Sequence, residues 1–166
     1  MLFLLAAALT VGDVLPKLEG DYLTGAKASL PGAARGKVTL LALGFSYESR
    51  FAVEPWVKQF RVEFGQRPDV AFYEVPMIGG MARMAKFFID SGMRRGTPKQ
   101  DHERVITVYG GASEWKQRLK VTDSDSAYVL LLDRNGKVLW QHSGKLDPLP
   151  WADLKAATAA ALDPAH

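Results

Sequence analysis

The chain has 166 residues, of which 48% are hydrophobic and 23% charged, with 15 Gly, 9 Pro and no Cys. This composition is typical of one globular domain and excludes a disordered chain, a collagen-like repeat and a disulfide scaffold. Without cysteine, thiol catalysis and thiolate metal sites are also excluded, whereas the redox compartment stays open. The net charge of +3 is scattered along the chain, which indicates solubility and no nucleic-acid partner.

The amino terminus reads MLFLLAAALTV over residues 1–11. This run is too short to span a bilayer as a helix, which takes about 20 residues. Its length suits the apolar part of a signal peptide, and the alanines at 6–8 suit cleavage, but no basic residue precedes it. Residues 1–11 are therefore either a signal-peptide remnant or a buried first segment. The first interpretation makes the protein exported, periplasmic or membrane-associated. The second makes it cytoplasmic, or mitochondrial in a eukaryote.

The rest of the chain shows no repeat or linker, so residues 12–162 are expected to form one domain and residues 163–166 a tail. Turn-rich residues 12–36 predict an opening loop or small hairpin. The continuous apolar run at 37–43 predicts a strand buried on both faces.

Helical and strand patterns then alternate along the chain. The predicted helices cover residues 46–64, 79–93, 112–121 and 151–162, and the predicted strands cover 69–78, 103–109, 127–133 and 137–144. Pro55 should kink the first helix or begin its second part. Asn135 and Gly136 supply the tight turn of a terminal hairpin. This order predicts a mixed central sheet with helices on both faces.

Three passages carry a resemblance to a known superfamily. They are GDVLPKLEG with the following LTG, KVTLLALGFSYESR, and YVLLLDRNGKVLW. In their order and spacing, the chain resembles the thioredoxin-like superfamily, in its peroxiredoxin and thiol-disulfide-reductase branch, over about residues 12–162. The resemblance implies an α/β three-layer sandwich with a mixed central sheet and an N-terminal hairpin extension.

In redox-active relatives, the turn after the buried strand carries Cys-x-x-Cys, and the helix amino terminus activates the first thiol. The equivalent positions here are Ser46 and Ser49, and Ala127 stands where the family usually places a cis-proline. The resemblance therefore implies a redox-inactive domain without a cofactor.

The two cysteine positions of the Cys-x-x-Cys motif can be aligned with this sequence in one other way. The helix proline usually follows the second Cys by five residues, whereas Pro55 is six residues after Ser49. A shift by one would equate the thiols with Tyr47 and Arg50, and redox inactivity would follow in either register.

Within the superfamily, ERVITVY and AYVLLLDRNGKVLWQHSG are similar to the fungal mitochondrial assembly factor for the membrane sector of ATP synthase and to its bacterial relatives. The matching positions are Tyr128, Asp133, Trp140, Ser143 and Gly144. This resemblance implies assistance in assembling or maturing a membrane or envelope protein complex, without catalysis. The partner would be a protein, such as an apolar membrane-protein segment. Membrane association would come only through that partner or an uncleaved amino terminus.

An enzyme remains the alternative. Gly44-Phe45-Ser46 imitates the nucleophile elbow of hydrolases, and Ser46, Asp133 and His142 follow the chain order of such enzymes. However, Glu48 replaces the second glycine of that motif, so Ser46 is expected to cap a helix instead. A serine hydrolase using Ser46 and an uncharacterised small-ligand role stay as alternatives.

Other candidate sites are weaker. Glu48 and Glu54 are six residues apart and should point in different directions on a helix, against paired acid-base chemistry. Asp123 and Asp125 lack the Gly and later Glu of a calcium loop. No metal is expected, because the three histidines have no ligand spacing; they are His102, His142 and His166.

Four of the five methionines lie between residues 77 and 93, together with Phe87 and Phe88. In one interpretation, Met81, Met84 and Phe88 simply cover the sheet. In the other, the segment forms a partner-binding groove, because methionine adapts to varied apolar partners. The candidate partner surface is Met77, Met81, Met84, Phe87, Arg94 and Arg95. The two arginines, with Lys86 and Lys99 nearby, form either an anion contact or a solvated loop.

Overall fold

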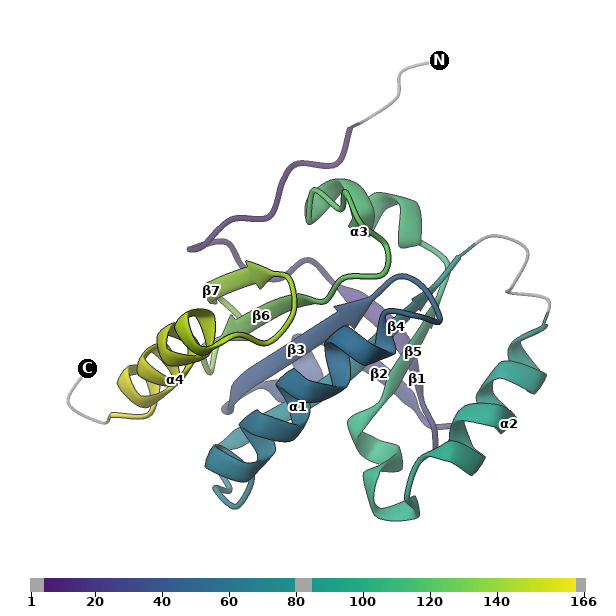
Figure 1. Cartoon of the computed structure of the whole chain (residues 1–166), viewed down its shortest axis with the longest axis horizontal. Helices are drawn as coiled ribbons and strands as arrows, with labels where there is room; N and C mark the ends of the chain where they lie inside the picture. The colour runs from purple at the N-terminus through teal and green to yellow at the C-terminus, as the bar shows by residue number, and fades with distance from the viewer. Residues whose placement is uncertain (1–4, 80–84, 164–166) are drawn as a thin grey trace.

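The structure is a computed structural model that describes residues 5–79 and 85–163. Within these residues, seven strands form one mixed sheet in the spatial order β2-β1-β5-β4-β3-β6-β7 (Figure 1). In chain order the strands are β1 (Leu18–Tyr22), β2 (Lys27–Leu30), β3 (Val38–Gly44), β4 (Val70–Ile78), β5 (Ile106–Tyr109), β6 (Tyr128–Leu132) and β7 (Val138–Ser143). β4 runs parallel to β3 and β5, and the other neighbouring pairs are antiparallel. The β1–β2 hairpin at one edge is the predicted extension.

Helices pack on both faces of this sheet. In chain order the helical elements are η1 (Gly32–Ala34), α1 (Arg50–Phe64), α2 (Lys86–Gly96), η3 (Lys99–Arg104), α3 (Ala112–Arg118) and α4 (Pro148–Leu162). α1 and α4 cover one face, where Trp56, Phe60 and Leu154 are buried. α3 covers the other face, where Trp115 and Leu41 belong to a second buried cluster. The predicted three-layer α/β architecture is therefore confirmed (Figure 1).

The central strand β3 positions the turn that leads to α1. All seven of its residues are buried, as the continuous apolar run predicted. β3 pairs with β4 in parallel and with β6 in antiparallel orientation, and Leu43 lies opposite Tyr128. The carboxyl end of β3 therefore adjoins the beginning of β6.

Three predicted helices begin at other residues than expected. α1 starts at Arg50 instead of Ser46, because the preceding residues form a turn, and it continues through Pro55 as one helix. α4 starts earlier, at Pro148, because proline suits the first helical position. α2 starts at Lys86, and residues 80–84 of the predicted helix lie outside the described residues.

Part of the segment before β1 packs onto the fold. The side chain of Leu9 is buried, and its backbone N–H donates to the carbonyl oxygen of Arg118 (2.8 Å). Leu5, in contrast, is exposed. Among the residues that the structure describes, no helix has the length and apolar character to cross a membrane. A signal-peptide remnant at residues 1–11 stays a prediction.

Candidate functional site

The turn between β3 and α1 is held by two serine side chains. Ser46 Oγ accepts a hydrogen bond from the backbone N–H of Ser49 (3.0 Å), and Ser49 Oγ donates to the carbonyl oxygen of Ser46 (2.6 Å). Ser49 is buried, whereas Ser46 is partly exposed and donates to Oδ1 of Asp125 (2.5 Å). Ser46 therefore caps the turn that leads into α1, and both hydroxyl groups are engaged.

The residues of the alternative hydrolase site are not brought together. Because β6 runs antiparallel to β3, Asp133 lies at the opposite end of β3 from Ser46. Its carboxylate accepts hydrogen bonds from backbone N–H groups of its own turn. The ring of His142 stacks on Trp140, with 5.8 Å between ring centroids. The structure therefore gives Ser46 no catalytic triad with Asp133 and His142.

A cleft of about 440 Å³ lies directly beside the serine turn, between α1 and α2. Its walls are largely apolar and come from the end of β3, the serine turn, α1, β4, α2 and the residue directly before β5. The large apolar side chains that line it are Val53, Phe88, Ile89, Met93 and Val105. Three charged side chains also line the cleft: Arg50, Glu54 and Glu74. A concave apolar site with a few charged groups is the usual form of a binding site.

Glu74 is the unusual group in this cleft. It lies within β4, on the sheet face that α1 covers, where its neighbours Val70 and Phe72 are part of the core. Burial, with smaller contributions from the negative charges of Glu54 and Asp101, raises the pKa of Glu74 from 4.5 to about 7. The carboxyl group is thus held in a place that disfavours its charged form.

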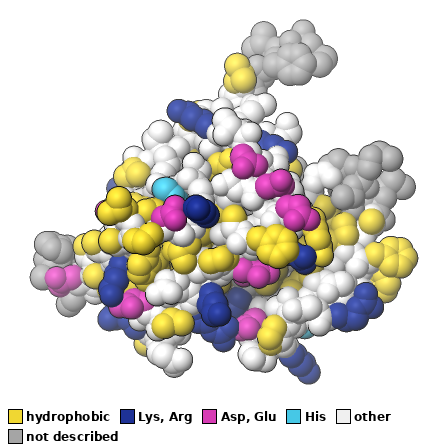
Figure 2. All heavy atoms as spheres, in the orientation of Figure 1, with side chains coloured by type: hydrophobic (Ala, Val, Ile, Leu, Met, Phe, Trp, Pro, Cys, Tyr) yellow, Lys and Arg dark blue, Asp and Glu magenta, His cyan; other side chains and the backbone are white. Residues whose placement is uncertain are grey.

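Exposed aromatic side chains surround the cleft. Tyr47 and Phe51 are exposed beside the serine turn, and the guanidinium of Arg50 lies 4.1 and 4.6 Å from their ring centroids. On α2, Phe87 and Phe88 are 72% and 76% exposed. Figure 2 shows hydrophobic side chains over the amino-terminal end of α1 and over the outer end of α2. Such a concentration of exposed aromatic rings indicates an interaction surface.

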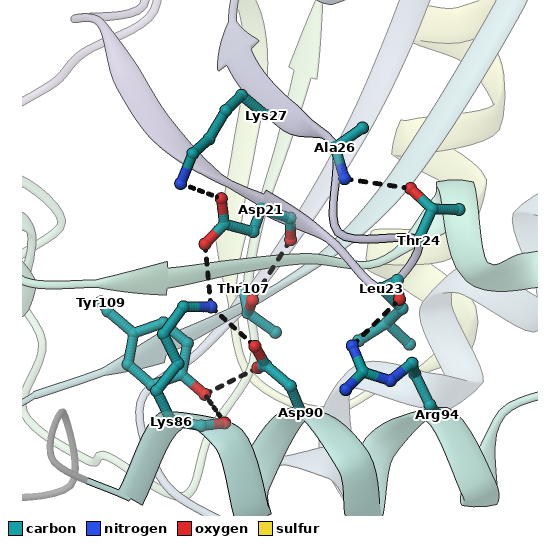
Figure 3. Close-up of polar contacts among 10 residues, drawn as sticks. All are labelled: Asp21, Leu23, Thr24, Ala26, Lys27, Lys86, Asp90, Arg94, Thr107 and Tyr109. Carbon is teal, nitrogen blue, oxygen red and sulfur yellow. Dashed lines mark hydrogen bonds and ion pairs between the residues drawn. The ribbon is translucent and has the colours of Figure 1, made fainter.

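Helix α2 contacts the sheet through polar side chains. The carboxylate of Asp90 accepts hydrogen bonds from Tyr109 Oη (2.7 Å) and Lys86 Nζ (2.6 Å) (Figure 3). Lys86 Nζ also pairs with Asp21 of β1 (2.9 Å), and Arg94 donates to the carbonyl oxygen of Leu23 (3.4 Å). The polar side of α2 therefore faces the sheet.

This arrangement inverts the usual polarity of a surface helix. Across α2, all of whose residues are described, Asp90 alone is buried, at 8% exposure. A surface helix normally turns its apolar side to the core. Here the apolar side chains Phe88, Ile89 and Met93 instead face the cleft.

The contacts that hold α2 to the sheet shift the pKa values of Asp21 and Tyr109. Burial raises the pKa of Asp21, but hydrogen bonds from Lys27 and Lys86 outweigh it and hold the pKa below its ordinary value. Burial and the hydrogen bond to Asp90 both raise the pKa of Tyr109. Asp21 therefore stays ionised and Tyr109 protonated at neutral pH, as this network requires.

The residues of the predicted partner surface differ in their exposure. Met77 is 3% exposed and belongs to the core, because it lies on the face of β4 that α1 does not cover; its assignment to a surface was wrong. Met81 and Met84 lie outside the described residues. Phe87 is exposed, and Phe88 does not cover the sheet. The interpretation of Phe88 as core packing was therefore wrong.

The residues of the predicted basic cluster lie in different environments. Lys86 is engaged by Asp21 and Asp90, and Arg94 is partly buried, whereas Arg95 is exposed. These residues do not form one free cationic patch. Among the described residues, no group of three or more acidic or histidine side chains could hold a metal ion.

Two important residues, Glu74 and Asp90, were missed from the sequence. A signal existed for Glu74, which is a single charged residue inside an apolar strand pattern. Glu54 was considered only as a partner of Glu48, but it lines the same cleft as Glu74. Ala127, the position expected to lack the cis-proline, is fully buried directly before β6.

A comparison with protein families matches residues 10–159 to the ATP10 protein family. The chain belongs to this family. Its membership and its fold support a role as an assembly factor for ATP synthase, which implies a protein partner in that assembly. The ATP10 family is associated with assembly at the mitochondrial membrane. No protein with a curated description matches this ATP10 family member.

Solved structures show a thioredoxin-like fold for this ATP10 family member. A proposed thiol:disulfide interchange protein DsbE from Chlorobium tepidum is 22% identical with a TM-score of 0.62, covering 94% of this chain and 100% of that one. BsSco, of the Sco family of cytochrome c oxidase assembly proteins, is 13% identical with a TM-score of 0.61 (93% and 96% covered). A thiol peroxidase from Chromobacterium violaceum is 12% identical with a TM-score of 0.60 (96% and 91% covered). These likenesses confirm the predicted fold.

Proposed function

We propose that this ATP10 family member binds an apolar segment of the membrane sector of ATP synthase in the α1–α2 cleft and holds it during assembly, without redox chemistry. The observation that carries the proposal is the inverted polarity of α2. Asp90 fastens the helix to the sheet, while Phe88, Ile89 and Met93 line the adjacent cleft.

This inversion favours a binding role over a purely structural one. Leaving large apolar side chains exposed forgoes about 1.5–3 kcal/mol for each that the core would bury. A groove of aromatic and methionine side chains accepts apolar helices of varied sequence. A partner segment bound in the cleft would therefore cover the apolar side chains that are exposed in the isolated domain.

The absence of thiols supports a role without electron transfer. The chain contains no cysteine, and the turn where thioredoxin-like enzymes carry two thiols here holds Ser46 and Ser49. An alcohol forms no disulfide. On this proposal Ser46 and Ser49 are the replaced thiol positions, and Ala127 takes the place of the cis-proline. The fold would then keep the site of a redox enzyme and use it for binding.

Where the protein acts depends on whether its amino terminus is an export signal. If residues 1–11 carry an export signal, the domain works outside the cytoplasm at a membrane, which is where an apolar segment of the ATP synthase would meet it. Sequencing the amino terminus of the protein from its native host tests this: a start after residue 8 supports export, and retention of residue 1 contradicts cleavage.

The functional test is rescue of ATP synthase assembly in a host that lacks the gene. Phe88→Asp places a charge on the cleft side of α2, whereas the control Leu149→Asp alters an equally exposed apolar residue of α4 (76% and 81% exposed). Assembled enzyme is measured by native gel electrophoresis. We expect Leu149→Asp to restore assembly and Phe88→Asp to fail while remaining folded by circular dichroism. Full rescue by Phe88→Asp would contradict the proposal.

A further inference from the structure

We infer that the α1–α2 cleft recognises a basic side chain, Lys or Arg, carried on an otherwise apolar segment of the partner, and that Glu74 with Glu54 receives its charge. This inference rests on the proposed function and specifies the chemistry of the segment. It follows from the charges in the cleft, from what surrounds them and from the cost of covering them.

The carboxylates of Glu54 and Glu74 both line the cleft. Among the described residues, no Lys or Arg pairs with Glu54 or Glu74. Arg50 also lines the cleft, but its guanidinium lies over the rings of Tyr47 and Phe51, and Arg61 pairs with Asp101 (2.8 Å). Among the described residues, both carboxylates of the cleft are therefore left without an ion-pair partner.

The apolar walls restrict which ligand fits this charge. Phe88, Ile89 and Val105 suit the methylene stem of a Lys or Arg side chain, whose charged head then reaches the carboxylates. An anion would meet the carboxylates of Glu54 and Glu74 without a favourable charge contact there. A wholly apolar segment would bury Glu74 further without a partner, and burying an unpaired charge is costly. A cation on an apolar stem satisfies both parts of the cleft.

Proton release should accompany such binding. Burial, with Glu54 and Asp101, raises the pKa of Glu74 to about 7, so the carboxyl group is partly protonated at neutral pH. The charged groups around it are Glu54 and Arg50 from α1 and Asp101 from η3. A cation from the partner would lower this pKa again and displace the proton. Binding of a basic segment should therefore tighten as the pH rises through about 7.

The test compares two synthetic peptides made of Leu, Ala and Ser that differ at one central position, Lys in one and norleucine in the other. Binding to the full chain is measured by fluorescence anisotropy of the dye-labelled peptides at about pH 8, where Glu74 is ionised. The variants are Glu74→Gln and the control Glu48→Gln, which changes an exposed carboxylate of the serine turn that does not line the cleft.

We expect the wild type and Glu48→Gln to bind the Lys peptide about tenfold more tightly than the norleucine peptide, as a charge-assisted hydrogen bond provides. Glu74→Gln should remove this preference: it should weaken binding of the Lys peptide and bind the norleucine peptide at least as tightly as the wild type, because no charge is then buried unpaired. Equal binding of both peptides to the wild type, with loss of both in Phe88→Asp, would overturn the inference and leave the proposed function intact. A Lys preference that persists in Glu74→Gln would also overturn it. Absence of binding by either peptide to the wild type would contradict the proposed function as well.

Discussion

Replacing Glu74 by Gln should stabilise the folded protein at neutral and alkaline pH. In the unfolded chain this carboxyl group ionises near 4.5, whereas burial first, and then the charges of Glu54 and Asp101, raise its pKa to about 7 in the fold. Between these values the folded protein binds the extra proton, so the free energy of unfolding falls as the pH rises through this window. The stabilisation present below 4.5 is lost above about 7.

The magnitude follows from the pKa difference. Each pKa unit corresponds to about 1.36 kcal/mol, so a rise from 4.5 to about 7 corresponds to about 3 kcal/mol. Gln keeps the shape of the side chain but has no charge to desolvate. The stability difference between Glu74→Gln and the wild type should therefore shift by about 3 kcal/mol in favour of the variant between about pH 4 and pH 8.

The assay is urea unfolding followed by circular dichroism across this pH range, with Glu48→Gln as the exposed control. The control should track the wild type at every pH. A constant difference between Glu74→Gln and the wild type, or a variant that is less stable at high pH, would refute the argument that Glu74 is an uncompensated carboxylate in the cleft.

Three further predictions concern α2 and the serine turn. Tyr109→Phe removes a hydrogen bond to the buried Asp90 and should destabilise the protein by about 1–2 kcal/mol, with faster amide exchange in α2 but not in β3; unchanged exchange in α2 would contradict the anchoring role. Gly44→Ala should cost about 1–3 kcal/mol in urea unfolding, because its Cβ would overlap the hydroxyl of Ser49, and Ser49→Ala should relieve part of that cost; additive effects would contradict the contact. The double variant Ser46→Cys, Ser49→Cys should form a reducible disulfide, with one thiol of lowered pKa measured by its alkylation rate; two thiols that stay unpaired in air would argue for the other register.

The sheet and its order were predictable because the local patterns agreed with the tertiary structure. β3 is buried on both faces, and its sequence at 37–43 is continuously apolar. The terminal hairpin was predictable from Asn135 and Gly136, where Gly136 takes a positive φ of 82°. The helix starts were less predictable, because the Ser46–Ser49 hydrogen bonds extend the turn before α1.

The candidate site was predicted only in part, because its chemistry depends on contacts between distant segments. Phe88 was expected to pack on the sheet, since apolar side chains usually define the buried side of a helix. Asp90 reverses this orientation, because its carboxylate accepts hydrogen bonds from Tyr109 and Lys86. The sequence does not reveal these contacts, because they form only where the fold brings α2 beside β5 and β1. Similarly, the sequence does not show that Glu74 lines a cleft, because that cleft forms only where α1 and α2 meet β4.

The central claim is that the α1–α2 cleft contacts the ATP synthase during assembly. Because the chain has no cysteine, one introduced thiol reports on one place. Gly92→Cys puts a thiol on the cleft wall, and Gly32→Cys puts one in η1, and in both cases the added Cβ meets open space. Each variant is labelled with a photoactivatable maleimide and incubated with membranes of its native host. The account predicts crosslinks from Gly92→Cys, and not from Gly32→Cys, to a membrane-sector subunit of the ATP synthase; equal crosslinking from both positions, or none from Gly92→Cys, would contradict it.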